Sequence, residues 1–536
     1  MAVVDLVRIA LVVLGIVFIA AEIRLASRRD RWSQVAHIGL ALVAGVNLVL
    51  VVFLVLNQIS FPLHLDLMEG SVLQHVQRAS SGQPIYPEPT PEYGPLAYNP
   101  LFYVLSIPFS QVFGVNLVTL RLLSLLGMVG IGVLIYRIIQ EKTRSVWWGF
   151  IAVGLFAAAY RAMDAYLNTA HSDSWLVFSA LLGCYIIDRD RSQVWNLVGV
   201  LVLVASFWFK QHGAMFLIAG VLYLTWRESI TSNLRTGLLR SIPYWLTAIL
   251  LGPALYLVGG PVLFGARFHY FTWEVPRGWS ELSLDTFIRY ARFIVRNYFV
   301  LALSGGALLI WAAIKNLKGI TIWHFLLVFS ALSGFMGALD PGSSDNVFIT
   351  MGALFIIMGT LGLYELGERV QAAKSFRLHL LGLVLSFALF LYDPAPFVVS
   401  PQAGESYDDL VAVLHSLDGP VYGPYQAQLP RDYELYPDLS GTSIYDMTRG
   451  PGKDPVNNLE IENRLFAPVI DPEGPAYILT NQPLGWETLS QYYVLDTDFE
   501  DRFSALRTLP KRWDHGYPRY LYRYDPEAAA AQKSGG

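Results

Sequence analysis

Two carboxylates and a histidine, His64, Asp66 and Glu69, directly follow a segment apolar enough to cross a membrane. Ionisable side chains at the edge of a membrane-embedded bundle are costly, so they usually have a function. Asp66 and Glu69 are three residues apart and would share one face of a helical turn. A positioned carboxylate can act as a general base. We predict Asp66 and Glu69 as catalytic residues; the competing interpretation of Asp66 is a helix-capping aspartate.

A second polar group precedes another apolar segment and contains Asp164, His171 and Asp173. Asp173 stands directly before that segment. It could be a helix N-cap there, although the neighbouring Ser172 or Ser174 could also cap the helix. We predict Asp173 as a catalytic residue, and His171 and Asp164 as substrate-binding residues.

Basic residues in two further connections could bind a phosphate. Lys210 and His212 lie in a very short turn between two apolar segments, and lysine is a compact charge suited to phosphate. The alternative is a lysine that extends its ammonium group to the membrane surface. Arg289, Arg292 and Arg296 form one helical stripe, which would suit either a phosphorylated headgroup or an amphipathic helix on anionic lipid.

The polar turn from Asp340 to Asn346 connects two apolar segments. Its Pro, Gly, Ser and Asp residues are typical of a tight turn, and turn chemistry alone could explain them. Asp345 and Asn346 could also bind sugar hydroxyls.

The composition indicates a polytopic membrane protein with a soluble part. Of 536 residues, 54% are hydrophobic and only 15% are charged, whereas soluble domains have about 25% charged residues. A net charge of -4 gives no indication of nucleic-acid binding, and the single cysteine, Cys184, excludes a disulfide framework within the chain. A glycine-rich loop with a lysine, typical of nucleotide binding, is missing from the sequence, so a soluble nucleotide is not the expected activated substrate.

The chain contains about twelve candidate membrane spans of roughly 20 apolar residues or fewer. They lie at residues 5–22, 37–58, 118–139, 146–162, 174–187, 194–208, 213–226, 241–259, 297–314, 321–339, 346–364 and 379–397. The first lacks a clear cleavage site, so we expect a retained span. Every second connection is short and basic, at residues 24–31, 137–144, 189–191, 227–240, 315–318 and 369–377, and is expected on the cytoplasmic side.

The expected fold is therefore mainly α: a transmembrane module over residues 1–397 and a small α/β domain over residues 398–536. The module has long outer loops at 59–117 and 260–296, with an interfacial helix over 99–114. The domain, with strands near 476–479 and 520–524 and a disordered tail after 528, would lie outside the plasma (inner) membrane.

The order of several motifs resembles the GT-C superfamily of membrane glycosyltransferases, specifically protein O-mannosyltransferases and the aminoarabinose transferase. These motifs are the acids Asp66 and Glu69, Gly82 with Pro84 and Tyr86, the run 93–103, Phe113 with Gly114, and residues 121–124, 171–176 and 209–213. The likeness covers roughly residues 37–400. In this family the two acids of the first motif are often adjacent, whereas here they are three apart.

The resemblance implies transfer of a sugar from a polyprenyl-phosphate donor to a glycan, lipid or protein acceptor on the outer face, with inversion. Asp66 would be the general base, and Lys210, His212 and the three arginines would bind the donor phosphate. Tyr93 and Tyr98 would bind substrate, and Asp66, His171 and Asp173 could hold a divalent metal such as Mg²⁺ or Mn²⁺. Two alternatives are a lipid-linked sugar transporter or flippase, which would carry ionisable groups near mid-bilayer, and a non-catalytic subunit of a cell-envelope complex.

Overall fold

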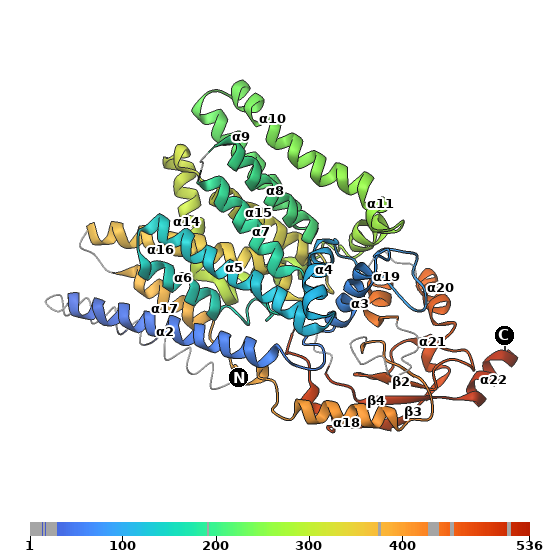
Figure 1. Cartoon of the computed structure of the whole chain (residues 1–536). Helices are drawn as coiled ribbons and strands as arrows, with labels where there is room; N and C mark the ends of the chain where they lie inside the picture. Colours follow the sequence, from blue (N-terminus) through green and yellow to red (C-terminus); the bar gives the residue numbers. More distant parts are fainter. Residues whose placement is uncertain are drawn as a thin grey trace.

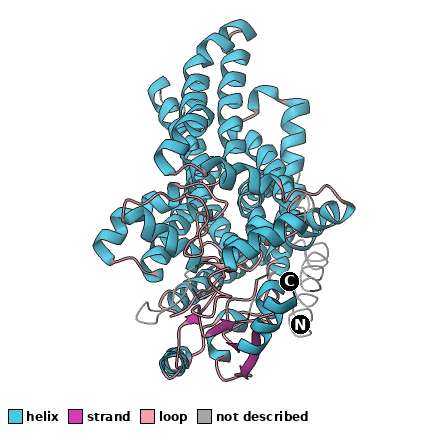
Figure 2. Ribbon diagram, turned by 90° about the vertical axis from the view of Figure 1, so that its right-hand side faces the viewer, coloured by secondary structure: helices cyan, strands magenta, loops and turns pink. Residues whose placement is uncertain are grey.

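The computed structural model describes Val13, Val17 and residues 29–189, 192–372, 377–426, 439–450, 455–511 and 516–535. Apart from the two valines, the expected first span at residues 5–22 lies outside the described residues. The described chain is mostly helical, with one small sheet at the end opposite the long helices (Figures 1 and 2).

The helices up to Leu389 form a bundle (Figure 1). They are α2 (Arg29–Gln58), α3 (Glu69–Ser80), α4 (Leu101–Phe113), α5 (Leu117–Thr143), α6 (Val146–Ala158), α7 (Asp173–Asp188), α8 (Gln193–Phe209), α9 (Gly213–Thr231), α10 (Leu234–Ile249), η2 (Leu250–Gly259), α11 (Gly260–Phe264), η3 (Tyr270–Glu274), α12 (Val275–Arg277), α13 (Leu284–Phe293), η4 (Ile294–Tyr298), α14 (Phe299–Lys315), η5 (Leu317–Gly319), α15 (Ile322–Ala338), η6 (Asp345–Phe348), α16 (Ile349–Ala372) and α17 (Leu378–Leu389).

Among the described residues, five helical stretches are long and apolar enough to cross a membrane: Ser33–Gln58, Leu117–Thr143, Leu234–Phe264, Leu284–Lys315 and Asp345–Arg369. Several of the other bundle helices are apolar but shorter. Each span expected from residue 37 onward falls on a helix. The last one is shorter than expected, because α17 ends at Leu389, four residues before Asp393 and Pro394.

Side-chain caps set several of these helix boundaries. The side chains of Asn116, Ser145 and Ser192 accept hydrogen bonds from the backbone N–H three residues later, at the starts of α5, α6 and α8. Such caps satisfy backbone donors that have no partner within the helix. Helix α4 ends at Gly114, whose φ of 81° suits glycine.

Close helix contacts fix the position of α7, which begins at Asp173. A Cβ on Gly127 of α5 would lie 2.8 Å from the Ser174 hydroxyl of α7. On the other side of α7, a Cβ on Gly183 would lie 2.8 Å from the carbonyl oxygen of Gly199 in α8. Small residues allow such close approach between membrane helices. Asp173 is therefore held at a defined place at one end of the bundle.

The C-terminal part of the chain combines short helices with a four-stranded sheet. Its elements are η7 (Ala395–Phe397), α18 (Ala403–His415), β1 (Val421–Tyr422), α19 (Gly441–Thr448), α20 (Pro455–Phe466), β2 (Tyr477–Thr480), α21 (Glu487–Ser490), β3 (Tyr493–Asp498), η8 (Ser504–Leu506), β4 (Tyr520–Tyr524) and α22 (Pro526–Gly535). The strand order is β1-β2-β4-β3, and only β1 and β2 are parallel.

Both strand-like runs of the sequence form strands, β2 and β4, and these pair with each other so that Leu479 is opposite Leu521. The tail was expected to be disordered, but α22 continues to Gly535. Alanine has the highest helix propensity of all residue types, and the alanine run in this tail explains the difference.

The C-terminal part is docked on one end of the bundle by several hydrogen bonds. Leu509 N donates to the carbonyl oxygen of Leu65 at 3.1 Å, and the Ser443 hydroxyl donates to the carbonyl oxygen of Gly94 at 2.5 Å. The guanidinium of Arg449 pairs with Asp340 at 2.7 Å. These contacts enclose the space described next.

Candidate active site

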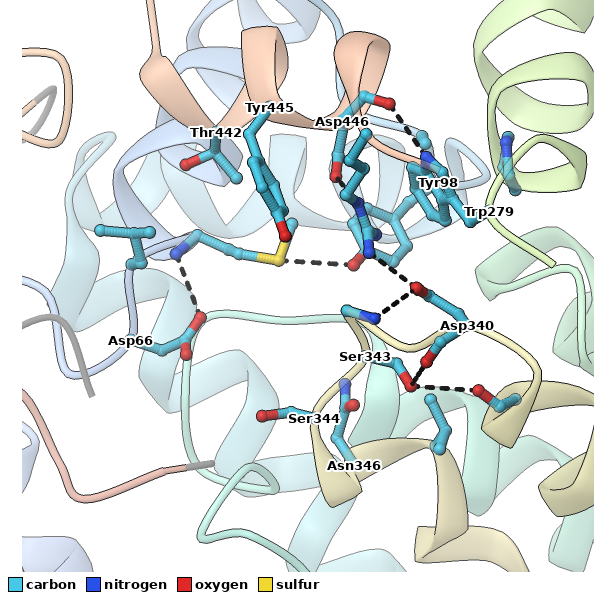
Figure 3. Close-up of a pocket in the computed structure, with 18 of the residues that line it drawn as sticks. Asp66, Tyr98, Trp279, Asp340, Ser343, Ser344, Asn346, Thr442, Tyr445 and Asp446 are labelled. Carbon is cyan, nitrogen blue, oxygen red and sulfur yellow. Dashed lines mark hydrogen bonds and ion pairs between the residues drawn. The ribbon is translucent and has the colours of Figure 1, made fainter. Parts of the chain in front are cut away.

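A cavity of about 780 Å³ lies between the end of the bundle and the C-terminal part of the chain (Figure 3). Asp66, Tyr98, Lys210, His212 and Asn346, all predicted from the sequence, line it from the bundle side. The opposite wall comes from α19 and from the segment that follows β2. A cavity of this volume can hold a ligand larger than a small-molecule fragment.

Asp66 reaches the cavity from the loop before α3 and is 9% exposed. Its Oδ1 accepts hydrogen bonds from the backbone N–H of Met68 at 3.0 Å and from the Tyr166 hydroxyl at 2.9 Å. The N-cap position of α3 belongs to Met68, so Asp66 forms a local turn and does not cap the helix. The side chain is thus held in place by two donors while it faces the cavity (Figure 3).

Glu69 lies away from the cavity and is bonded to Arg121. The two side chains are each 1% exposed and 2.6 Å apart. Backbone N–H groups of Leu65 and Ala170 also donate to Glu69, each at 2.7 Å. The Arg121 guanidinium in turn donates to the carbonyl oxygens of Phe61 and Leu63. Unlike Asp66, Glu69 therefore joins the loop before α3 to α5 and to the loop before α7.

Asp173 is the first residue of α7 and is the centre of a buried polar network behind the cavity wall. Its Oδ1 accepts a hydrogen bond from Lys210 Nζ at 2.8 Å. Its Oδ2 contacts His171 Nδ1 and accepts a hydrogen bond from the Asn346 amide at 3.4 Å. A negative charge at a helix N-terminus is favourable. The structure thus brings together Asp173, His171, Lys210 and Asn346, which are far apart in the sequence.

Lys210 and His212 reach the cavity from the tight turn between α8 and α9. The ammonium group of Lys210 lies 5.3 Å from the centre of the Tyr98 ring, and the Tyr98 ring contacts His171 edge-on. Burial lowers the pKa of His212 to about 4, with a further contribution from the charge of Lys210. At neutral pH, the positive charge of this turn therefore comes from Lys210 alone.

The predicted metal ligands do not form an open site for a cation. Among the described residues, three or more His, Cys, Asp or Glu side chains do not gather where they could hold a metal ion. Both oxygens of Asp173 are already engaged by Lys210, His171 and Asn346, and Asp66 Oδ1 is engaged by Tyr166 and Met68. These groups do not fit a shared metal, and we write no reaction step through one.

The arginine stripe does not reach the cavity. Arg289 donates to the carbonyl oxygens of Asp340, Ser343 and Ser344, and these hydrogen bonds stabilise the polar turn before α16. Asp345 lies 3.5 Å from the same guanidinium. Arg292 and Arg296 are exposed on the outside of α13 and η4. Phosphate contacts of this stripe inside the cavity are therefore not supported by its placement, and spacing alone could not reveal the turn that contacts Arg289.

Two other predicted substrate-binding residues also lie outside the cavity lining. Tyr93 is buried, donates to the carbonyl oxygen of Ile85 at 2.9 Å and has the Arg78 guanidinium over its ring. Asp164 is buried in a loop with a left-handed φ of 58°, and burial raises the pKa of its carboxyl group to about 6 although the Lys511 ammonium opposes this shift. Its backbone oxygen accepts a hydrogen bond from Lys511 at 2.9 Å. Both residues shape the loops that carry the cavity residues.

Several cavity residues were not predicted from the sequence. They are Tyr166, Arg277 and Trp279 on the bundle side, and Thr442, Asp446, Arg449 and Asn481 on the C-terminal side. Arg449 pairs with Asp340 at 2.7 Å and with Asp446 at 3.2 Å, and its guanidinium lies 3.8 Å from the centre of the Trp279 ring. Burial raises the pKa of Asp446 to about 6, although Arg449 opposes this shift.

Comparison with solved structures finds similar folds. ArnT from Cupriavidus metallidurans bound to undecaprenyl phosphate is 12% identical, with 91% of this chain and 98% of that chain covered and a TM-score of 0.48. An oligosaccharyltransferase from Archaeoglobus fulgidus in the apo form is 11% identical, with 81% of this chain and 69% of that chain covered and a TM-score of 0.45. The chain is similar in fold to these two proteins.

Comparison with protein-family models gives no match to this chain, and comparison with curated proteins gives none either. We therefore base the functional proposal on the cavity and its residues.

Proposed function

We propose that the chain is a glycosyltransferase that moves a sugar from a polyprenyl-phosphate-linked donor to an acceptor on the outer face of the membrane. The observation that supports this most is one cavity lined by both a carboxylate, Asp66, and an ammonium group, Lys210. A base for the acceptor and a positive charge for the leaving phosphate are the two groups that such a transfer needs.

In the proposed reaction, Asp66 takes the proton from an acceptor hydroxyl as that oxygen attacks the anomeric carbon of the donor sugar. The new carbon–oxygen bond forms while the bond from the anomeric carbon to the phosphate oxygen breaks. The phosphate leaves with the electron pair, and Lys210 stabilises its added charge. A single displacement of this kind inverts the anomeric centre.

Arg277 is a second cation for the donor phosphate. Arg277 is exposed and lines the cavity, whereas Lys210 is buried and already forms an ion pair with Asp173. A phosphate next to Lys210 would add a second negative partner to that ammonium group, and the exposed guanidinium of Arg277 can approach the same phosphate from the cavity. In this proposal Arg277 takes the place that the sequence assigned to Arg289.

The charge distribution supports an outer location for the cavity. Basic residues gather at the helix ends remote from it: Lys142 pairs with Asp188 at 2.7 Å and Arg189 pairs with Glu141 at 2.7 Å, at the ends of α5 and α7. Asp173 and Arg121 mark the opposite ends of these helices. Since Lys and Arg favour the cytoplasmic side, the cavity end would face outward.

The test is a transfer assay with the purified protein and a panel of polyprenyl-phosphate sugars and acceptors, read by mass spectrometry. We expect one donor to lose its sugar and Asp66→Asn to lower kcat by about 100-fold or more. Asp285→Asn, the same change at an exposed position of α13, is the matched control and should keep full activity.

Normal transfer by folded Asp66→Asn would overturn the base assignment. A protein that moves a labelled lipid-linked sugar across vesicle membranes without transferring the sugar would overturn the enzyme proposal in favour of a flippase.

A further inference from the structure

The wall of the cavity formed by the C-terminal part carries buried polar side chains. We call this wall the roof; its polar residues are Thr442 and Asp446 of α19 and Asn481, which follows β2. Thr442 and Asp446 are four residues apart and share one face of α19. In Figure 3, α19 holds them across the cavity from Asp66, Ser344 and Asn346.

Each roof residue has a buried polar atom without a hydrogen-bond partner among the described residues. These atoms are Thr442 Oγ1, Asp446 Oδ2 and Asn481 Nδ2. The residues are 7%, 4% and 6% exposed. Other described residues also have buried unpaired polar atoms, but only these three line the cavity, so a ligand in the cavity is the partner within their reach.

The other polar atom of two of these side chains is already fixed. Asp446 Oδ1 accepts a hydrogen bond from Arg449 Nε at 3.2 Å, and Asn481 Oδ1 accepts one from Gln426 Nε2 at 2.7 Å. The remaining carboxylate oxygen and the remaining amide N–H are therefore oriented in advance. Such pre-organisation is typical of a binding site, because the ordering cost is met before the ligand arrives.

The chemistry of the three free atoms selects the kind of ligand. Asp446 can only accept while it is ionised, Asn481 Nδ2 can only donate, and the Thr442 hydroxyl can do both. Sugar hydroxyls both donate and accept, so a saccharide carries groups that can pair with each of these atoms. A phosphate offers acceptors only and is repelled by the Asp446 carboxylate.

An aromatic pair completes the roof. Tyr425 and Trp486 both line the cavity, and their rings are stacked with centres 5.7 Å apart and an angle of 21° between them. Both rings are half-buried, and both lie against Gly441, the residue before Thr442. Flat, partly exposed aromatic faces next to hydrogen-bonding groups suit the C–H faces of a pyranose ring.

We propose that the roof is the acceptor subsite and that the acceptor which it binds is a saccharide. The assignment of the roof as an acceptor subsite rests on the proposed glycosyl transfer. Saccharide binding by the roof does not depend on that transfer. The donor phosphate belongs at Lys210 and Arg277 on the bundle side. The acceptor hydroxyl would then approach Asp66 from the roof side.

The test is saturation-transfer NMR on the full-length protein in nanodiscs, with methyl glycosides of mannose, galactose, glucose and N-acetylglucosamine as probes and the peptide acetyl-Ala-Ser-Ala-amide as comparison. We expect saturation of at least one glycoside. Thr442→Val and Asn481→Leu should each weaken its binding about fivefold to fiftyfold, the effect of one lost hydrogen bond that leaves ligand groups unpaired.

Thr448→Val is the matched control for Thr442→Val. It makes the same change on the same helix, but the Thr448 hydroxyl donates to the carbonyl oxygen of Ile444 and does not line the cavity. It should bind the glycoside like the unchanged protein. Asn481→Leu lies on a different element, so loss of folding in one roof variant leaves the other as a test.

Three outcomes overturn the proposal: no glycoside is saturated, only the peptide is saturated, or both roof variants bind the glycoside normally. A further arm adds a short-chain polyprenyl-phosphate-linked mannose, and displacement of the glycoside by it would show that the roof binds the donor's own sugar. Failure of the transfer reaction is a separate result, because the NMR signal requires no transfer. Transfer to a non-sugar acceptor without glycoside binding would overturn the roof proposal alone.

Discussion

Tyr166 donates its hydroxyl hydrogen to Asp66 Oδ1 at 2.9 Å, and Tyr166 is itself held by Lys511 from the C-terminal part of the chain. The Lys511 ammonium lies 4.1 Å from the centre of the Tyr166 ring and donates to the backbone oxygen of Asp164. Asp164 and Ala165, directly before Tyr166, have φ values of 58° and 52°. This unusual backbone aims the Tyr166 hydroxyl at the proposed base.

Tyr166→Phe should lower kcat about tenfold, because a hydrogen bond to a charged group contributes roughly 1.5–3 kcal/mol and part of that orients Asp66. The KM for the donor should change little, since the proposed phosphate-binding residues are Lys210 and Arg277. Steady-state transfer kinetics on purified protein measure both values. Tyr517→Phe is the control: its hydroxyl donates to Asp501 at 2.8 Å in the C-terminal part, away from the cavity. An unchanged kcat in Tyr166→Phe would contradict the orienting role.

Glu69→Gln should destabilise the fold and leave the chemistry intact. The change leaves the buried Arg121 charge without its partner, and breaking such a pair costs roughly 3–5 kcal/mol. The thermal unfolding midpoint in detergent should therefore fall clearly, while kcat per folded molecule stays close to that of the unchanged protein. Glu405→Gln on the exposed face of α18 is the control. A stable Glu69→Gln protein with a kcat as low as that of Asp66→Asn would make Glu69 catalytic.

The bundle side of the site could be predicted from sequence because its residues share one local property. Asp66, Asp173, Lys210 and Asn346 each stand where an apolar segment begins or ends, and alternate ends of successive spans meet on one side of a membrane. That rule placed them together without any knowledge of helix packing. It did not distinguish Asp66 from Glu69, because only the fold brings Arg121 of α5 to Glu69.

The roof could not be predicted in this way. Arg449 and Asp340 are in contact although they are 109 positions apart in the chain, and no sequence pattern around either residue predicts this contact. Thr442 and Asp446 are common residues on a short polar helix, and their unpaired atoms become visible only when α19 is docked. The arginine stripe is the opposite case, because its periodic pattern is clear in the sequence. Its first member, Arg289, nevertheless hydrogen-bonds to Asp340 in a turn 51 residues further along the chain.

Arg277→Gln should raise the KM for the donor about threefold to tenfold and leave kcat nearly unchanged. An exposed guanidinium contributes modest binding energy to a phosphate through charge-assisted hydrogen bonds. The effect should shrink at high salt, because exposed charges are screened. Arg292→Gln, on the exposed side of α13, makes the same change outside the cavity and serves as control. A larger effect for Arg292→Gln would restore the phosphate site expected from the sequence.

Asp164→Asn should remove a pH dependence of stability. Burial raises the pKa of Asp164 from 3.8 to about 6, against the opposing charge of Lys511. Between about pH 4 and 6 the folded state therefore binds this proton more tightly than the unfolded state does. The stabilisation is complete below about pH 4 and is lost as the pH rises through 6, a change of about 3 kcal/mol in the free energy of unfolding.

Asparagine suits this test because it adopts the left-handed conformation more readily than most residues, so the φ of 58° remains acceptable. Thermal unfolding of the detergent-solubilised protein at pH 4.5 and pH 7 measures the difference. The unchanged protein should lose more stability over this interval than Asp164→Asn does, and Asp285→Asn should behave like the unchanged protein, because Asp285 is exposed. Equal losses in all three proteins would mean that Asp164 titrates alike in the folded and unfolded states, and that Lys511 fully offsets its burial.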